Sequence, residues 1–219
     1  MTKPVKSRPY HAPRRREAAA QTRRAILDAA TRLFAENGYT AVKMAEIAAE
    51  AGVATDTVYA AVGPKPVLFR LLIERAISGE DEPVTAEERD YVRAIHAEPD
   101  ARRKLAIYAK AIRHIQARLA PLFLALQAAA SSEPELAALW TEIGERRSTN
   151  MRRLAAELAE TGSLRDDISV DEAADVIWSM NAAEFYVLLV RQRGWEPERY
   201  EQWLTDAWQR LLLDNRAER

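Results

Sequence analysis

Residues 44–61 read MAEIAAEAGVATDTVYAA, and this stretch decides the fold of the first part of the chain. Two short helical segments flank Gly52. Helices cross steeply over a tight turn only where the crossing side chains are small and the turn residue accepts a positive φ, conditions that Ala48 and Gly52 satisfy. An apolar underside would dock this corner on another helix, and it consists of Ile47, Ala51, Val53 and Val58. We therefore predict a compact corner of two helices with a short, polar outer ridge.

Helical periodicity extends in both directions from this corner and predicts an all-α protein. Before it, apolar residues from Ile26 to Phe34 recur at steps of three and four, which indicates a helix of about 18 residues ending at Asn37-Gly38. After it, a helix starts near Pro66 and stops at Ser78-Gly79. The longer helices expected beyond this point cover residues 85–97, 100–119, 121–131, 134–161, 170–193 and 197–213.

Composition and charge narrow the class of protein. The 219 residues include 48% hydrophobic residues and no cysteine, so the chain can bury a sizeable core and has no disulfides. Its longest apolar runs are shorter than a membrane span, so we expect a soluble, cytoplasmic protein with no membrane partner. Residues 1–77 carry a net charge of +6 and residues 78–219 a net charge of −7. The basic part is suited to a polyanion such as nucleic acid.

These features predict three regions. Residues 1–20 form a basic, flexible arm, residues 21–79 a helix-turn-helix DNA-binding domain, and residues 83–219 a larger helical domain. The basic run at residues 14–16 either enters a minor groove of DNA or remains a solvated tail.

The first domain resembles that of TetR-family transcriptional regulators. The resemblance lies in linked motifs between Arg23 and Ile77, namely Ile26-Leu27-Asp28-Ala29-Ala30, Leu33-Phe34-Ala35-Glu36-Asn37-Gly38-Tyr39, Ile47-Ala48, Ala51-Gly52-Val53, Thr57-Val58-Tyr59, and Lys65 ahead of Leu68-Phe69. Ser or Thr is common in the family where Val42 and Ala54 stand, so the helix caps are weaker here or shifted to Thr40 and Thr55.

The resemblance implies specific roles on DNA. It places Tyr59 and Lys65 on phosphates and the short side chains of Thr55, Asp56 and Thr57 at or near base edges. Lys43 adds a cation at the start of the first helix of the corner, beside the positive end of that helix. Arg23 and Arg24 would flank the DNA backbone.

The second domain carries more apolar surface than one core can use. The segment 170–193 and the last helix, 197–213, are predicted to pack against their copies across a two-fold axis and form a homodimer. The alternative is a core that is entirely intramolecular.

Bulky apolar residues with occasional polar ones between Leu105 and Met151 predict a small-molecule cavity. The candidate ligand-pocket residues are Tyr108, His114, Phe123, Gln127, Trp140, Asn150, Trp178 and Phe185.

An enzyme is not expected. Only three histidines are present, none with the spacing of metal ligands, and all seven glycines are isolated, so no metal or cofactor is predicted. The sequence thus predicts a sequence-specific DNA-binding regulator, a repressor that a small-molecule ligand releases from a palindromic operator. The alternative is a helical protein-interaction adaptor that does not bind DNA.

Overall fold

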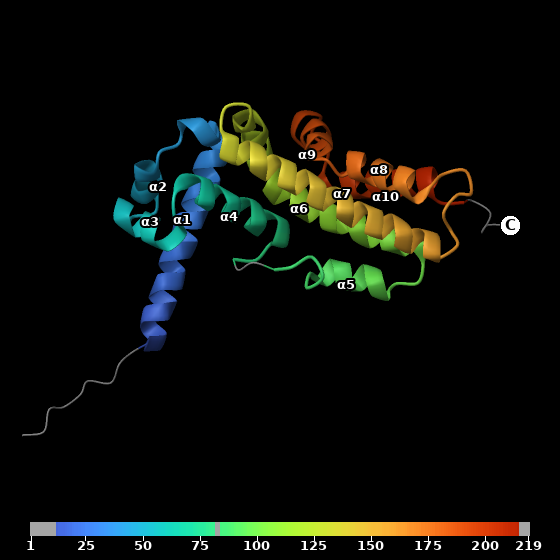
Figure 1. Ribbon diagram of the computed structural model, residues 1–219, viewed down its shortest axis with the longest axis horizontal. Helices are drawn as coiled ribbons and strands as arrows, with labels where there is room; N and C mark the ends of the chain where they lie inside the picture. The colour runs from blue at the N-terminus through green and yellow to red at the C-terminus, as the bar shows by residue number, and fades with distance from the viewer. Residues whose placement is uncertain (1–11, 82–83, 215–219) are drawn as a thin grey trace, which may run out of the picture.

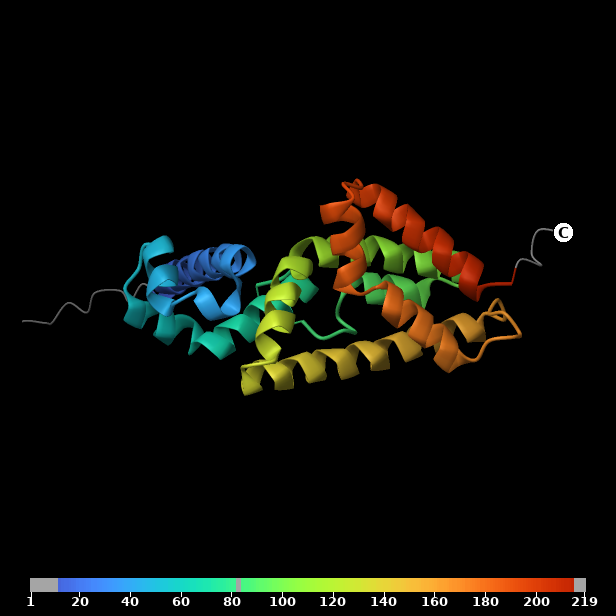
Figure 2. The same ribbon diagram turned by 90° about the horizontal axis from the view of Figure 1, so that it is seen from above.

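The protein, as described by a computed structural model over residues 12–81 and 84–214, consists of two groups of helices at opposite ends of an elongated molecule (Figures 1 and 2). The first group contains α1, α2, α3 and α4 and the second contains α5 to α10. The bounds are α1 Ala12–Ala41, α2 Met44–Glu50, α3 Thr55–Val62, α4 Lys65–Ser78, α5 Asp90–Ala97, α6 Ala101–Ala130, α7 Pro134–Glu160, α8 Val170–Met180, α9 Ala183–Tyr186, a π-helical segment Val187–Gln192, and α10 Pro197–Leu212. The all-α architecture that the periodicity predicts is confirmed.

The first helix is longer than the sequence predicted. α1 includes residues 12–20 of the expected arm, and its first turns project beyond the rest of the domain (Figure 1). The alanine-rich run that follows Glu17 has high helix propensity, which accounts for the extension. Residues 1–11 of the predicted arm lie outside the described residues. Gly38, with φ 76° and ψ 171°, breaks the helical path where the sequence predicted a stop.

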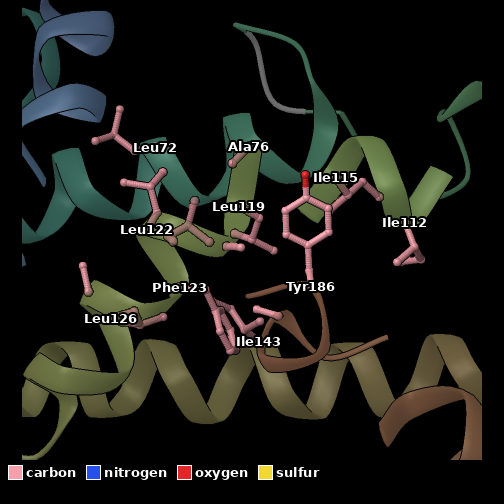
Figure 3. Packing of buried hydrophobic residues seen from close by; sticks show 14 of the residues in the cluster. Leu72, Ala76, Ile112, Ile115, Leu119, Leu122, Phe123, Leu126, Ile143 and Tyr186 are labelled. Carbon is pink, nitrogen blue, oxygen red and sulfur yellow. The ribbon is translucent and has the colours of Figure 1, made fainter. Parts of the chain in front are cut away.

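Helix α6 links the two groups of helices. It packs on α1 and α4 on one side and on α7 and α10 on the other. Figure 3 shows Leu72 and Ala76 of α4 next to Leu119 and Leu122 of α6, and all four side chains are buried. The apolar contact is reinforced by Arg118, whose Nε donates to the carbonyl oxygen of Ala76 at 3.0 Å.

Three helix boundaries differ from the predicted ones. α6 runs through Pro121, where the sequence predicted a break; the proline removes one backbone hydrogen bond, and the helix bends instead (Figure 2). The helix predicted at 85–97 begins only at Asp90, because Thr85 and Glu88 form a turn before it. The single helix predicted at 170–193 is divided at Asn181 and Ala182 into α8 and α9.

The described residues contain no single helix long and apolar enough to cross a membrane. The pair formed by α8 and residues Ala183–Gln192, bent by 43°, passes such a test by length and composition alone.

Two glycine substitutions test the turn that the corner depends on. Gly52 has φ 68°, so Gly52→Ala should lower the free energy of unfolding by about 1 kcal/mol. Gly144 lies inside α7 and a Cβ there would also meet open space, so Gly144→Ala should raise it by about 0.5–1 kcal/mol. Urea denaturation followed by circular dichroism measures the free energy of unfolding of both variants. Changes of the same sign in the two variants would contradict the proposed strain at Gly52.

Candidate nucleic-acid interface and ligand cavity

The corner between α2 and α3 is closed by backbone hydrogen bonds. The N–H of Val53 donates to the carbonyl oxygen of Ala48 at 2.9 Å across the turn that Gly52 makes. Ile47 and Val58 are fully buried beneath the corner, as predicted, and α2 and α3 both pack on α1. The corner is therefore fixed to the first helix by its apolar side.

The opposite side of α3 is open to solvent. Asp56, Tyr59 and Ala60 are exposed, Tyr59 by 48%, while Thr55 and Thr57 are half-buried. The ridge is narrow and bears short side chains apart from the phenol of Tyr59. A helix with this outer surface can enter a DNA major groove without steric conflict.

Two lysines lie beside this ridge. Lys43 is exposed at the N-cap of α2, where its backbone N–H donates to the Glu46 carboxylate at 2.7 Å. Lys65 begins α4, and its Nζ lies 4.2 Å from the ring centroid of Tyr39. Burial lowers the pKa of Lys65 and raises the pKa of Tyr39 to about 12. The N-cap residues of α2 and α3 are Lys43 and Ala54, so the caps have not shifted to Thr40 and Thr55.

The two predicted backbone-flanking arginines have partners within the protein. Arg23 donates from Nη1 to the carbonyl oxygen of Ala61 at 2.8 Å, which ties α1 to the C-terminal end of α3. Arg24 forms an ion pair of 2.8 Å with Asp81, and Arg75 joins Asp81 to Asp28. Arg23 therefore orients α3, and the network around Asp81 holds the end of α4 against α1.

A cavity of about 170 Å³ lies in the second group of helices. Its wall is formed by α6 and α7 with contributions from α5, from the end of α4 and from the break before α9. The apolar lining includes Ile77, Ile115, Leu119, Phe123 and Ile143. Because Ile77 belongs to α4, the cavity reaches an element of the first group of helices.

Three of the eight predicted pocket residues line this cavity, namely Tyr108, Phe123 and Asn150. The other five do not line it. Trp140 stacks behind Phe123 at 4.6 Å, and Phe185 stacks on Trp203 at 5.8 Å. Periodicity places a side chain on a helix but cannot say which face meets a cavity, which explains why His114, Gln127 and Trp178 were also selected.

A buried polar cluster forms part of the cavity wall. Asn181, which is 1% exposed, donates from Nδ2 to the Tyr108 hydroxyl at 2.8 Å. Gln116 donates from Nε2 to the backbone carbonyl of Asn181 at 2.6 Å. Burial raises the pKa of Tyr108 well above its usual value, so this hydroxyl stays protonated. Asn181 was missed in the sequence because it lies in an apolar run with no glycine or proline beside it.

Apolar side chains remain exposed on the helices predicted to dimerise. Trp178 of α8 is 38% exposed, Leu188 of the π-helical segment 50% and Leu211 of α10 45%. The opposite side of α10 is buried in the domain through Tyr200, Leu204 and Trp208. Helices that bury one side in their own domain and leave large apolar side chains exposed on the other are typical of a protein–protein interface.

The corner on α2 and α3, joined to a larger helical domain with a cavity, defines a two-domain helix-turn-helix protein. Comparison with known proteins specifies the family, since residues 26–65 match the family model for bacterial regulatory proteins of the tetR family. The chain thus carries a TetR-family DNA-binding domain at its N-terminus.

Solved structures extend the likeness to the whole fold. A proposed transcriptional regulator from Saccharomonospora viridis in complex with choline is 21% identical with a TM-score of 0.68, covering 90% of this chain and 100% of the other. NalD from Pseudomonas aeruginosa, the secondary repressor of the MexAB-OprM multidrug efflux pump, is 21% identical with a TM-score of 0.68, covering 91% and 99%. The fatty acid degradation regulator FadR from Bacillus halodurans is 21% identical with a TM-score of 0.66, covering 90% and 97%. No curated protein matches the sequence.

Removal of the Asn181 side chain tests the buried cluster. Asn181→Ala should lower the free energy of unfolding by about 1–3 kcal/mol, because it deletes the hydrogen bond to Tyr108 and leaves a void. Asn150→Ala is the matched control on the same cavity wall, with an expected effect of less than about 0.5 kcal/mol. Thermal or urea unfolding compares the stability of the two variants. Equal losses of stability would show that the hydrogen bonds of Asn181 contribute no more than those of an ordinary residue of the cavity wall.

Proposed function

We propose that this protein is a sequence-specific DNA-binding transcriptional regulator that acts as a homodimer and is a repressor released from a palindromic operator by a small-molecule ligand. The exposed outer ridge of α3, on a corner whose other side is fully buried, is the observation that carries the proposal. The TetR-family domain at residues 26–65 supports it.

The side chains of the ridge divide by chemistry. The Tyr59 hydroxyl and the Lys65 and Lys43 ammonium groups serve as phosphate contacts, which position the protein without regard to sequence. Thr55, Asp56 and Thr57 serve at base edges, where the Asp56 carboxylate can accept from the amine of cytosine. Arg23 and Arg24 act indirectly, by supporting the helices that carry the ridge, since each is bound to another residue of this protein.

The dimer would form through α8, the π-helical segment and α10. Pairing of these elements across a two-fold axis covers Trp178, Leu188 and Leu211 together. Two copies of α3 would then face half-sites one helical turn apart, about 34–36 Å, on one side of the duplex.

The position of α6 suggests how a bound ligand would release the protein from DNA. A ligand in the cavity contacts Leu119 and Phe123 of α6 and Ile77 of α4, so it favours one arrangement of α4 against α6 over another. The S. viridis relative was solved with choline, which supports a ligand-binding role for this domain. A coupling of about 1–3 kcal/mol would weaken operator binding roughly 5- to 150-fold.

Substitutions on the ridge separate positioning from recognition. Tyr59→Phe and Lys65→Ala should weaken binding to all duplexes alike. Lys65→Ala should also reduce, by about 1, the slope of the logarithm of the binding constant against the logarithm of the salt concentration. Asp56→Ala and Thr57→Ala should change which duplexes are preferred. Selection from a random duplex pool, followed by binding at two salt concentrations, measures both effects.

Lys110→Ala, an exposed lysine on α6, is the control for lost charge and should leave DNA binding unchanged. Absence of salt-dependent binding to any duplex would favour the alternative, a helical adaptor. Unchanged preferences in all four ridge variants would show that α3 does not read the sequence.

Charge placed on the exposed apolar surface tests the dimer. Leu188→Glu and Leu211→Glu should each shift the protein toward monomer, because a carboxylate would be buried in the proposed interface. Leu124→Glu, at an exposed leucine of α6, should leave the oligomeric state unchanged. Sedimentation velocity reports the result, and a wild-type protein that is monomeric throughout would exclude this interface.

A further inference from the structure

Polar groups without partners gather around the cavity. Six buried side-chain nitrogen and oxygen atoms among the described residues have no hydrogen-bond partner, and four of these belong to residues that line the cavity. The four are Arg89 Nε, Arg147 Nε, Gln116 Oε1 and Asn181 Oδ1. Two are cationic donors and two are amide acceptors, so the cavity presents both kinds of group to whatever occupies it.

The two unpaired acceptors are fixed by neighbouring hydrogen bonds. Gln116 and Asn181 are 4% and 1% exposed. The Gln116 amide must present its nitrogen to the backbone carbonyl of Asn181, which leaves Oε1 as the free atom. A buried acceptor left unpaired is costly, so these two residues favour a ligand with a hydrogen-bond donor.

The cavity wall has more arginine than carboxylate. Most charged groups on the wall have a partner of opposite charge. Glu87 pairs with Arg153 at 2.7 Å, and Arg146 pairs with Glu74 at 2.8 Å. Glu157 pairs with both Lys104, at 2.8 Å, and His96, at 2.7 Å. Arg89 and Arg147 form no ion pair with a carboxylate of the described residues.

Arg147 is the better placed of the two unpaired arginines. It donates from Nη2 to the carbonyl oxygen of Trp178 at 2.8 Å, and its guanidinium carbon lies 4.3 Å from the Trp178 ring centroid. Burial lowers the pKa of Arg147, and the electrostatic fields of Tyr108 and, to a smaller extent, Glu184 act in the opposite direction. Arg147 is half-buried, with a buried Nε that has no hydrogen-bond partner, and a guanidinium without a bound carboxylate is a site for an anion.

The remaining wall is apolar, and the cavity of about 170 Å³ is close in size to one of about 150 Å³ that holds benzene. The ligand skeleton is therefore about the size of one six-membered ring with substituents.

We propose that the cavity binds a small organic acid with a compact apolar skeleton and a hydroxyl group. The carboxylate would pair with Arg147, and the hydroxyl would donate to Gln116 Oε1 or Asn181 Oδ1. This assignment rests on the proposed function of the second domain as the ligand-binding part of a regulator. It also distinguishes this cavity from one suited to a cation such as choline.

Isothermal titration of the full-length protein, without DNA, tests the ligand class. The probes are meta- and para-hydroxybenzoate, para-hydroxyphenylacetate, benzoate, para-hydroxybenzamide and choline. At least one hydroxy acid should bind about ten- to a hundred-fold more tightly than the neutral amide, which lacks the charge, and about two- to ten-fold more tightly than benzoate, which lacks the donor. Choline should bind more weakly than any of the acids.

Two neighbouring arginines of α7 supply a matched pair of variants. Arg147→Gln should abolish the preference for the acid over the amide, whereas Arg146→Gln, which removes an arginine already paired with Glu74, should preserve it. The selectivity between two probes is the readout, because a general loss of structure would weaken both probes equally. If Arg147→Gln does not fold, the selectivity of the wild-type protein decides the matter.

Three outcomes would overturn the assignment: no hydroxy acid binds more tightly than the amide, choline binds best, or Arg147→Gln and Arg146→Gln act alike. Equal binding of benzoate and every hydroxy acid would overturn the hydroxyl part. Anisotropy of a labelled operator duplex, with and without the best acid, separates this inference from the proposed function. Binding of the acid with no effect on DNA would support the ligand class and contradict release, whereas operator binding with no acid bound would support the DNA-binding function and contradict the ligand class.

Discussion

The hydrogen bonds around Asn181 are the constraint on which the second domain depends. Extended backbone at Ala182, with ψ 146°, ends α8 and frees the carbonyl of Asn181 from any helical partner. Gln116 of α6 satisfies that carbonyl, and the Asn181 amide reaches Tyr108, also on α6, and Met151 on α7. Since a buried polar group without partners is costly, the break in one helix fixes the positions of two others.

The same cluster determines where the cavity can form. α8 packs on α7, whereas α9, displaced by the bend, packs on α6. The polar cluster lies on the cavity wall between these helices, and Ile112, Ile115 and Leu119 of α6, whose side chains are drawn in Figure 3, line the cavity as well. Leu122 of α6 lies beside Leu72 of α4, in the first group of helices (Figure 3). Helix α6 thus contacts both the cavity and the DNA-binding domain, which is the simplest physical basis for coupling between them.

The sequence predicted the first domain well because its signals are local. Each local signal specifies one geometric feature: Gly52 the turn with positive φ, Ala48 the close helix crossing, and the apolar Ile47 and Val58 the buried side of the corner. The structure shows each of these features. It predicted the second domain less well because the deciding contacts join residues far apart in the chain. Asn181 is separated by 65 residues from Gln116 and by 73 from Tyr108, and an isolated asparagine in an apolar run carries no local signal of a helix break. Tyr108 and Asn150 were identified as polar positions, but the arginines of the cavity resembled ordinary surface charges of α7.

The distribution of charge explains why such arginines matter. The second part of the chain is acidic overall, with a net charge of −7 over residues 78–219, and seven of its arginines form ion pairs with carboxylates. Arg113, for example, pairs with both Glu198 and Glu201. Arg147 differs from these, because it is half-buried on the cavity wall and its polar partners are a backbone carbonyl and an indole ring, an arrangement that packing alone does not require. Apolar residues of similar volume would stabilise the wall at least as well, so the retained charge is most simply understood as a contact for a ligand that carries the missing negative charge.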